Sequence, residues 1–413
     1  MTVGPLHIFL SFLKLGFTAF GGPVAHLAFF RAEFVEAKKW LSEEDYTELV
    51  ALCQFLPGPA SSQVGLAIGY LRGGYLGSVL AWTAFTLPSA IILVILALSY
   101  SSLGSSVPTG LLLGLKAVTV AVVVQALWGM SRAILISKLH KTIAVVSAVS
   151  LLYFNLIWLP IVLIACSALV GLVLFKSESN SDAQHPSSSL FDHISKGRKS
   201  GFVWLSVFVV SLITLALLAH LYPDSGIALF DAFFRTGAMV FGGGHVVLPL
   251  LEVETVQRAW IEKEAFLVGY GATQAMPGPV FTFSAYLGAL SNLPAEHAQH
   301  PSFLFGVELK NALLALLGIF LPSFFMVYAA LPFWKILRTN TRIKSALIGI
   351  NACVVGILLA ALYDPIITTA LGSLDGSSKQ IIAILFAYLA LAVWKLPPWL
   401  VVIAGALLGL IYY

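Results

Sequence analysis

The sequence predicts an all-α integral membrane protein that contains two related halves. Its composition, its recurring apolar runs and one repeated motif support this prediction. Of its 413 residues, 59% are hydrophobic and 10% are charged, whereas a soluble domain carries roughly 25% charged residues. Apolar runs of about 20 residues, the length that crosses a bilayer as a helix, recur along the whole chain. We therefore expect about 10–13 transmembrane helices.

The repeated motif combines a basic residue, a glycine run, a tryptophan and a Pro-Gly-Pro turn. The first copy is Lys14, Phe20-Gly21-Gly22-Pro23, Trp40 and Gln54-Phe55-Leu56-Pro57-Gly58-Pro59. The second copy is Arg235, Phe241-Gly242-Gly243-Gly244, Trp260 and Gln274-Ala275-Met276-Pro277-Gly278-Pro279. The offset is 221 at the basic residue and 220 at the tryptophan. Helix breaks at corresponding places in two halves of a membrane protein point to a transporter's binding site.

The apolar runs divide the chain into four parts. These are a first repeat at 1–175, a cytoplasmic linker at 176–200, a connecting transmembrane helix at 201–226 and a second repeat at 227–413. We expect spans near 5–28, 50–71, 76–100, 108–132, 202–221, 228–250, 265–290, 303–330, 343–363, 380–394 and 397–413, and a span or two short helices around Asn155 at 142–175. The number of full spans is nearer ten if the short pairs are hairpins that enter the bilayer and return.

Basic residues indicate the orientation of the chain. Clusters around Arg132, in the linker and around Arg342 belong in the cytoplasm by the positive-inside rule. With these ends inside, the opening helix of the first repeat runs outward and that of the second runs inward. The halves are then inverted repeats with broken helices at a central site. Arg31, Lys38 and Lys39 would lie outside, against the rule, although their segment is net acidic.

Polar segments follow each glycine run, at 31–48 and 251–264. We expect helices along the membrane interface there, with Trp40 and Trp260 at headgroup depth. Glu33 and Glu254 match in position within these segments. They are candidates for proton coupling, and the alternative is a solvated helix face.

Each helix break is a candidate anion site. Gly21, Gly22, Pro23 and Gly242, Gly243, Gly244 form one pair of breaks; Pro57, Gly58, Pro59 and Pro277, Gly278, Pro279 form the other. In a bilayer a break persists only where its freed backbone groups find new partners. A helix that restarts there offers unpaired N–H groups and a positive dipole end to an anion. Ser61 would lie in one new first turn. The alternative is that these are packing kinks.

Side chains near the breaks complete the predicted site. Lys14 and Arg235 each precede the glycines by seven residues, and we expect them to face a shared anion, unless they extend to the interface. Gln54 and Gln274 precede the Pro-Gly-Pro turns and can donate hydrogen bonds without adding charge; the alternative is a helix-to-helix bond. His26, a further candidate for proton coupling, and His245, a candidate for substrate binding, lie close to breaks. Either could titrate near neutral pH, as histidine does in water, although a structural role is the simpler interpretation.

Other features narrow the function. Lys116 lies in apolar sequence without a basic counterpart and is a candidate for one half's gate. Leu87-Pro88-Ser89 and Leu321-Pro322-Ser323 form a further repeated kink. Cys53, Cys166 and Cys353 are too scattered for a metal site. The chain lacks a phosphate-binding loop, an HxxxH metal motif and a nucleophile elbow. We therefore expect no enzyme activity, no cofactor, no metal and no nucleic-acid partner; a homodimer stays open.

These motifs resemble the chromate ion transporter family in its long, two-repeat form. The similarity rests on both copies of the repeated motif together with His245, Val280-Phe281-Thr282-Phe283 and Ala285-Tyr286-Leu287-Gly288, and it covers the chain apart from 176–200. The resemblance implies export of chromate across the bacterial inner membrane, driven by the membrane potential or a proton gradient, and chromate resistance. A carrier of sulfate or another tetrahedral oxyanion is the nearest alternative. An intramembrane enzyme or a structural subunit is more distant.

Overall fold

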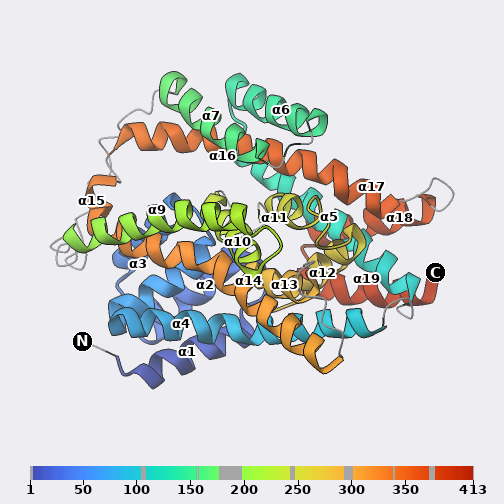
Figure 1. Ribbon diagram of the computed structural model, residues 1–413, viewed down its shortest axis with the longest axis horizontal. Helices are drawn as coiled ribbons and strands as arrows, with labels where there is room; N and C mark the ends of the chain where they lie inside the picture. Colours follow the sequence, from blue (N-terminus) through green and yellow to red (C-terminus); the bar gives the residue numbers. More distant parts are fainter. Residues whose placement is uncertain are drawn as a thin grey trace.

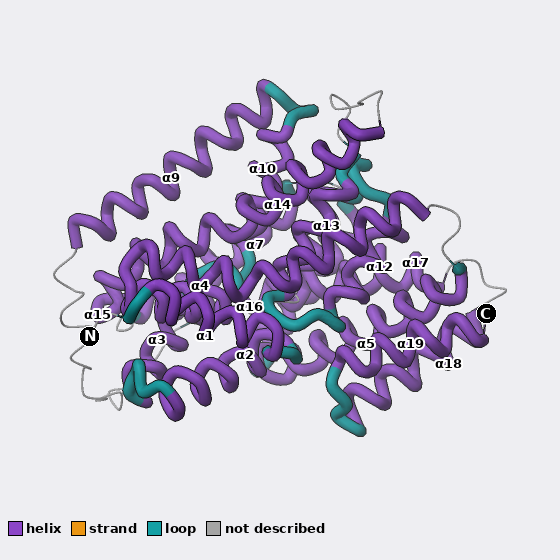
Figure 2. Tube along the Cα trace, turned by 90° about the horizontal axis from the view of Figure 1, so that it is seen from below, coloured by secondary structure: helices purple, strands orange, loops and turns teal. Residues whose placement is uncertain are grey.

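The computed structural model describes residues 3–103, 108–154, 156, 158–175, 198–241, 247–292, 301–337, 340–371 and 377–412. Across these residues the chain is helical and no strand occurs (Figures 1 and 2). Five of the described helices are long and apolar enough to cross a membrane: α4 (Ala60–Leu103), α5 (Thr109–Ile134), α9 (Arg198–Leu221), α14 (Pro301–Ala330) and α16 (Thr341–Ala361). The prediction of an all-α membrane protein is confirmed.

Two short helices in the first half form a hairpin. They are α1 (Pro5–Thr18) and α2 (Gly22–Arg31). The chain reverses between them because Gly21 and Gly22 adopt φ values of +99° and +79°, which favour glycine. The reversal brings the Trp40 ring to 5.8 Å from the ring of His7, near the start of α1. The prediction of a single span at 5–28 is therefore wrong: the chain enters and returns to the same end of the molecule.

A second hairpin joins α3 (Glu43–Phe55) to the first part of α4. Gly58, at φ +122°, makes the turn. The two open ends of this hairpin lie together, since Asp45 is within electrostatic reach of Arg72. The Val3 amide donates to the Arg72 carbonyl at 2.9 Å, so both hairpins open at one end of the molecule. The 44-residue α4 then bends at Gly74, where φ is +64°.

The second half repeats this arrangement. Its short helices are α10 (Gly226–Met239), α11 (Val247–Thr255), α12 (Lys263–Thr273) and α13 (Phe283–Leu290). Arg235 of α10 reaches Glu254 of α11, and the Asn292 amide donates to the Trp260 carbonyl at 3.1 Å. Both contacts join segments on either side of a reversal. The predictions of single spans at 228–250 and 265–290 are therefore wrong for the same reason as in the first half.

The tips of the hairpins meet across the two halves. The Gly58 amide donates to the Val240 carbonyl at 2.7 Å, and the Gly278 amide donates to the Ala19 carbonyl at 2.9 Å. These four residues pair by the same offsets as the motif, 221 for Ala19 and Val240 and 220 for Gly58 and Gly278. Backbone groups freed by a break must be paired inside a bilayer. Each half thus supplies the partner that the other half's break needs.

The hairpins of the two halves open at opposite ends of α9. In the first half, Tyr75 follows the Gly74 bend and its hydroxyl lies 3.0 Å from Trp204 Nε1 and 3.4 Å from Ser200 Oγ, near the start of α9. In the second half, α10 begins at Gly226, just after α9 ends at Leu221. α9 runs from Arg198 to Leu221, across the boundary between the expected linker at 176–200 and the expected connecting helix at 201–226. Residues 176–197 lie outside the described part.

This topology removes the exception to the positive-inside rule. The turn that carries Arg31, Lys38 and Lys39 lies at the end of the molecule where α9 begins, as do the basic residues at the start of α9. Figure 1 shows the N-terminus and α15 (Trp334–Leu337) at the left, and α17 (Thr368–Leu371), α18 (Ser377–Tyr388) and the C-terminus at the right. Residues 31–39, the start of α9 and α15 therefore lie at one end of the molecule, the end that the positive-inside rule would place in the cytoplasm.

The remaining helices interlock the two halves. α5 of the first half packs against α18 and against α19 (Pro398–Tyr412), which come from the second half. α16 of the second half packs against α6 (Lys138–Tyr153) and α7 (Leu159–Leu174), which come from the first. Glycines allow these backbones to approach closely, as is typical of membrane helices: Gly114 lies against Gly409, and Gly349 against Gly171. In Figure 2, by contrast, α9 lies along the outside of the molecule.

The close contact between α10 and α14 gives a test of this packing. A methyl group added at Gly237 would overlap the Ile319 carbonyl, whereas one added at Gly306 meets nothing within 4 Å. We expect Gly237→Ala to destabilise the protein by about 1–3 kcal/mol through overpacking. The control Gly306→Ala should be neutral or slightly stabilising, because alanine is the better helix former. Thermal unfolding of the purified protein in detergent measures both, and equal midpoints for the two variants would contradict the packing.

Candidate functional site

The hairpin tips meet at the Gly58–Val240 and Gly278–Ala19 hydrogen bonds, a place that we call the crossing. A cavity of about 480 Å³ lies beside it. Gly278, which bonds to Ala19 across the halves, is part of its wall. Four segments form its wall: the start of α2, the second half of α5, the end of α12 with the turn that follows it, and the start of α19. The lining residues are Gly21, Gly22, Val122, Gln125, Ala126, Gly129, Met130, Thr273, Gln274, Met276, Gly278, Val280 and Pro398. Both halves of the chain therefore contribute to one cavity, and none of these described lining residues is charged.

The restarted helix α2 directs its N-terminus at this cavity. Gly21 is its N-cap residue, in the left-handed conformation, and no side chain caps the helix. The first N–H groups of a helix have no partners within the helix, and the dipole is positive at that end. Pro23 lies in the first turn and carries no N–H, so the amides of its neighbours supply the donors. This end of α2 is suited to an anion.

Gln274 supplies a second neutral donor. It caps the C-terminus of α12 and lines the cavity. Its Nε2 atom is buried and has no hydrogen-bond partner among the described residues. Tyr270, one turn earlier, lies beside the Gln274 side chain. A buried donor without a partner is costly, so the cavity is suited to a ligand that accepts hydrogen bonds.

Gln125 is a lining residue that the sequence did not predict. It lines the cavity from α5, and its Nε2 donates to the Leu391 carbonyl at 3.2 Å. That carbonyl lies in a π-helical stretch, Leu389–Val393, where the regular helical bonding is interrupted. Gln125 has no place in the repeated motif, so the motif could not indicate it. What could have indicated Gln125 in the sequence is its amide side chain within the apolar run that forms α5.

The two predicted cations are paired with carboxylates and do not line the cavity. The Lys14 side chain is 64% exposed, and its Nζ lies 2.8 Å from Glu33. The Arg235 side chain is 6% exposed and donates to both carboxylate oxygens of Glu254, at 2.7 and 3.1 Å. Arg235 also contacts Asp231 at 2.8 Å. The charge of each cation is thus balanced within its own hairpin.

These pairs belong to a repeated cluster of three charges. Lys38 lies 3.5 Å from Glu33 and over the Trp40 ring. Arg258, at offset 220, lies 3.0 Å from Glu254 and over the Trp260 ring. In each half, a carboxylate that follows the first helix break in sequence therefore pairs with two cations. One cation precedes the break, and the other follows the carboxylate. The cluster holds the two arms of its hairpin together. Its central pair is buried in the second half, where Arg235 and Glu254 are 6% and 7% exposed, whereas Lys14 in the first half is exposed.

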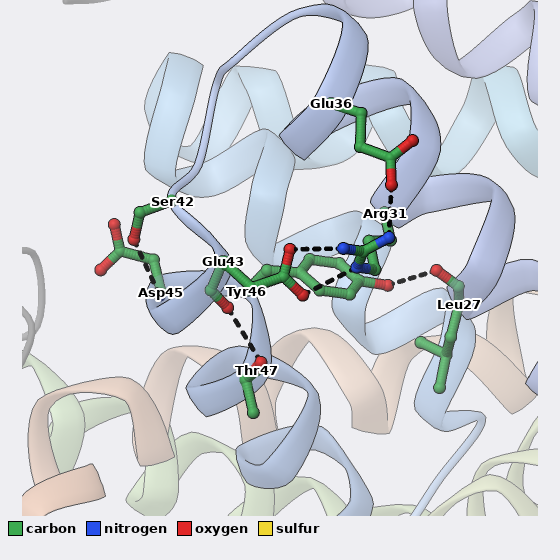
Figure 3. Close-up of polar contacts among 8 residues, drawn as sticks. All are labelled: Leu27, Arg31, Glu36, Ser42, Glu43, Asp45, Tyr46 and Thr47. Carbon is green, nitrogen blue, oxygen red and sulfur yellow. Dashed lines mark hydrogen bonds and ion pairs between the residues drawn. The ribbon is translucent and has the colours of Figure 1, made fainter. Parts of the chain in front are cut away.

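Polar contacts also join the first hairpin to the second. Figure 3 shows Arg31 at the end of α2 between the carboxylates of Glu36 and Glu43. The Tyr46 hydroxyl donates to the Leu27 carbonyl at 2.6 Å (Figure 3). The hydrogen bonds from Arg31 hold the pKa of Glu43 below its usual range. These contacts fix where α3 begins, and through it where the Gly58 turn lies.

The other predicted residues have different environments. His26 is buried, with Nδ1 3.3 Å from Ser61 Oγ and its ring edge against Phe85. Gln54 lies on the exposed face at the end of α3. Pro57 and Pro59 flank Gly58, and Pro277 and Pro279 flank Gly278, so these four prolines frame the crossing turns. Gly242, Gly243, Gly244 and His245 lie outside the described residues. Within the described part, no three His, Cys, Asp or Glu side chains converge as metal ligands would.

Hairpins that meet at mid-depth beside a cavity define a membrane transporter rather than a receptor or a structural bundle. The chain belongs to the chromate transporter family, whose model matches residues 6–172 and 227–410. It is 27% identical to the "Probable chromate transport protein" of Synechococcus elongatus, covering 97% of this chain and 94% of that protein. It is 26% identical to the "Chromate transport protein" of Pseudomonas aeruginosa, covering 86% and 80%. No solved structure matches the chain.

The unequal burial of the two clusters predicts unequal effects of mutation. Arg235→Ala leaves Asp231 buried without a cation and Glu254 with Arg258 alone, which costs about 3–5 kcal/mol. Lys14→Ala removes a cation from an exposed pair, worth about 0–1 kcal/mol. We expect Arg235→Ala to lose most of its folded, membrane-inserted protein and Lys14→Ala to keep it. Size-exclusion profiles of the detergent-extracted variants measure this, and comparable losses in both would show that burial does not set the cost.

Proposed function

We propose that this protein is a secondary transporter that exports chromate across the bacterial inner membrane and thereby gives chromate resistance. The observation that carries the proposal is the cavity at the crossing, which both halves line. The N-terminus of α2, which no side chain caps, points into it, and the Gln274 amide places an unpaired donor there. Membership of the chromate transporter family supports chromate as the substrate.

The chemistry of the cavity suits a tetrahedral dianion. Chromate offers four oxygens and only accepts hydrogen bonds when it is fully ionised. The first-turn amides of α2, the Gln274 amide and the Gln125 side chain are neutral groups that can surround it. Because none of the described lining residues is charged, the substrate does not have to break an ion pair to leave. A transporter must bind its substrate favourably enough to load it and weakly enough to release it.

The clusters that contain Lys14 and Arg235 have a different role in this proposal. They hold the arms of the hairpins so that the tips meet. Glu33 and Glu254 accept the ion pairs within these clusters, and His26 lies at the crossing. These three residues are the candidates for proton coupling if export is driven by proton exchange.

The energetics favour export. We propose that residues 1–175 and 227–413 are inverted repeats that rock around the fixed crossing. Because the inside of the cell is negative, moving one negative charge out of the cell is favoured by about 2.3 kcal/mol per 100 mV. A dianion gains twice that, so the membrane potential alone can drive export. Sulfate has the same shape and charge, and the donors in the cavity would bind it too, so sulfate transport is the second candidate function.

Everted membrane vesicles test the proposal directly. We expect uptake of radiolabelled chromate that requires this protein, is stimulated by an imposed inside-positive potential and is weakened by excess sulfate. Imposing a pH gradient without a potential separates proton exchange from electrical driving. Vesicles that take up labelled sulfate but not chromate would replace the proposed substrate. Vesicles that take up neither anion would refute transport of a tetrahedral oxyanion.

The Gln274 amide gives a test at the level of the site. A hydrogen bond to a charged group is worth about 1.5–3 kcal/mol, so Gln274→Leu should raise the KM for chromate about 10- to 100-fold. The matched control is Gln257→Leu, the same change at an exposed glutamine outside the cavity. Initial rates in vesicles, at equal amounts of inserted protein, measure both. An unchanged KM in Gln274→Leu would exclude this amide from substrate binding.

A further inference from the structure

α5 and α12 pack against each other beside the cavity, and both line it. Lys116 of α5 forms an ion pair with Glu264 of α12. Further along, Thr119 Oγ1 lies 3.3 Å from the Leu267 carbonyl, and Gly271 leaves room for the Thr119 side chain. The same two helices carry Gln125 and Gln274 into the cavity. The pairing of these helices therefore both positions the two amides and seals the space beyond them.

The chain contains a second pair of helices that corresponds to α5 and α12. α3 corresponds to α12 by the motif offset of 220, which pairs Gln54 with Gln274. α16 corresponds to α5, since each follows a Leu-Pro-Ser helix and each holds the terminal hairpin of the other half. Gly349 lies against Gly171 as Gly114 lies against Gly409. Aligning Gly114 of α5 with Gly349 of α16 gives an offset of 235, and at this offset Thr119 corresponds to Val354.

The two pairs are in different arrangements. The face of α12 that carries Glu264, Gly271 and Gln274 is covered by α5. The corresponding residues of α3 are Glu44, Ala51 and Gln54, and all three are exposed. Among the described elements, no comparable packing joins α3 to α16. Two halves of similar sequence thus present one closed helix pair and one open pair.

We propose that these are the two positions of one conformational exchange, and that Lys116 and Glu264 form the ion pair that must open during transport. In the other state α16 packs against the exposed face of α3, while α5 separates from α12. This inference rests on the proposed function, because it assigns the closed and open sides of that cavity. Lys116 and Glu264 act as positioning residues, since neither lines the cavity.

The location and exposure of the ion pair fit this role. Lys116 precedes Gln125 by nine residues on α5, about 13 Å along a helix. The other end of α5 carries Arg132, one of the cytoplasmic basic residues, so the pair closes the outer side of the cavity. The Glu264 side chain is 44% exposed, whereas that of Lys116 is 8% exposed. One partner is already hydrated, which lowers the cost of separating the pair.

Cysteine cross-linking tests the exchange in a background that lacks Cys53, Cys166 and Cys353. Thr119→Cys with Gly271→Cys places two thiols within disulfide reach across the closed pair. We expect oxidation to reduce chromate transport at least about tenfold and reduction to restore it. The matched control keeps Cys353 and adds Ser147→Cys, because the native side chains at these positions already lie 3.3 Å apart across α6 and α16. That cross-link joins helices that move together and should leave transport unchanged.

Two further measurements keep the inference testable if the first variant folds poorly. Ala51→Cys with Val354→Cys should cross-link only when the α3 pair closes, and added chromate should change the extent of cross-linking. This readout does not need transport, so it separates failure of the exchange from failure of the proposed function. Lys116→Glu and Glu264→Lys should each impair transport about tenfold, and the double variant should recover it. Full transport by the oxidised 119/271 variant, or no 51/354 cross-link under any condition, would overturn the inference.

Discussion

The structure depends on one constraint: backbone N–H and C=O groups freed inside a bilayer must be bonded again. Each half of this chain breaks its helices twice with glycine and proline, and each break exposes such groups. The Gly58 amide reaches the Val240 carbonyl and the Gly278 amide reaches the Ala19 carbonyl. The two halves therefore satisfy each other's breaks. Neither half on its own supplies both bonds, which explains why a duplicated unit forms one interlocked body.

The distribution of charge follows from this arrangement. A hairpin that stops at mid-depth must hold its two arms together, and in each half a carboxylate does so between two cations. The buried cluster around Arg235 adds Asp231, whose position in the first half is occupied by Leu10. Because the cations are balanced by these carboxylates, the cavity keeps a neutral lining of amides and backbone groups. Chromate would be recognised there by its hydrogen-bond acceptors, within the positive field of an unpaired helix end.

Much of the class and part of the site were predictable from sequence. Composition indicated the membrane environment, and the glycine and proline breaks indicated where helices restart. Apolar length alone, however, does not distinguish a helix that crosses from a hairpin that returns, so the predicted single spans over the hairpins were wrong. The offset between the two halves changes from 221 at Glu33 and Glu254 to 220 at Trp40 and Trp260. Lys38 and Arg258 lie just after this change, and their correspondence was not predicted. Gln125 was missed because its role depends on packing between α5 and the second half, which no local pattern encodes.

The central claim is that the hairpins of the two halves enter from opposite faces and meet in the middle. Ala37 and Gln257 are exposed, correspond at offset 220 and lie in the turns that close the two charge clusters. In a cysteine-free background, Ala37→Cys, Gln257→Cys and the reference Lys199→Cys can each be labelled with a membrane-impermeant thiol reagent in intact cells and in everted vesicles. We predict that the thiols introduced at positions 37 and 199 react only in everted vesicles, and that the thiol at position 257 reacts only in intact cells. Labelling of positions 37 and 257 from the same face would contradict the account.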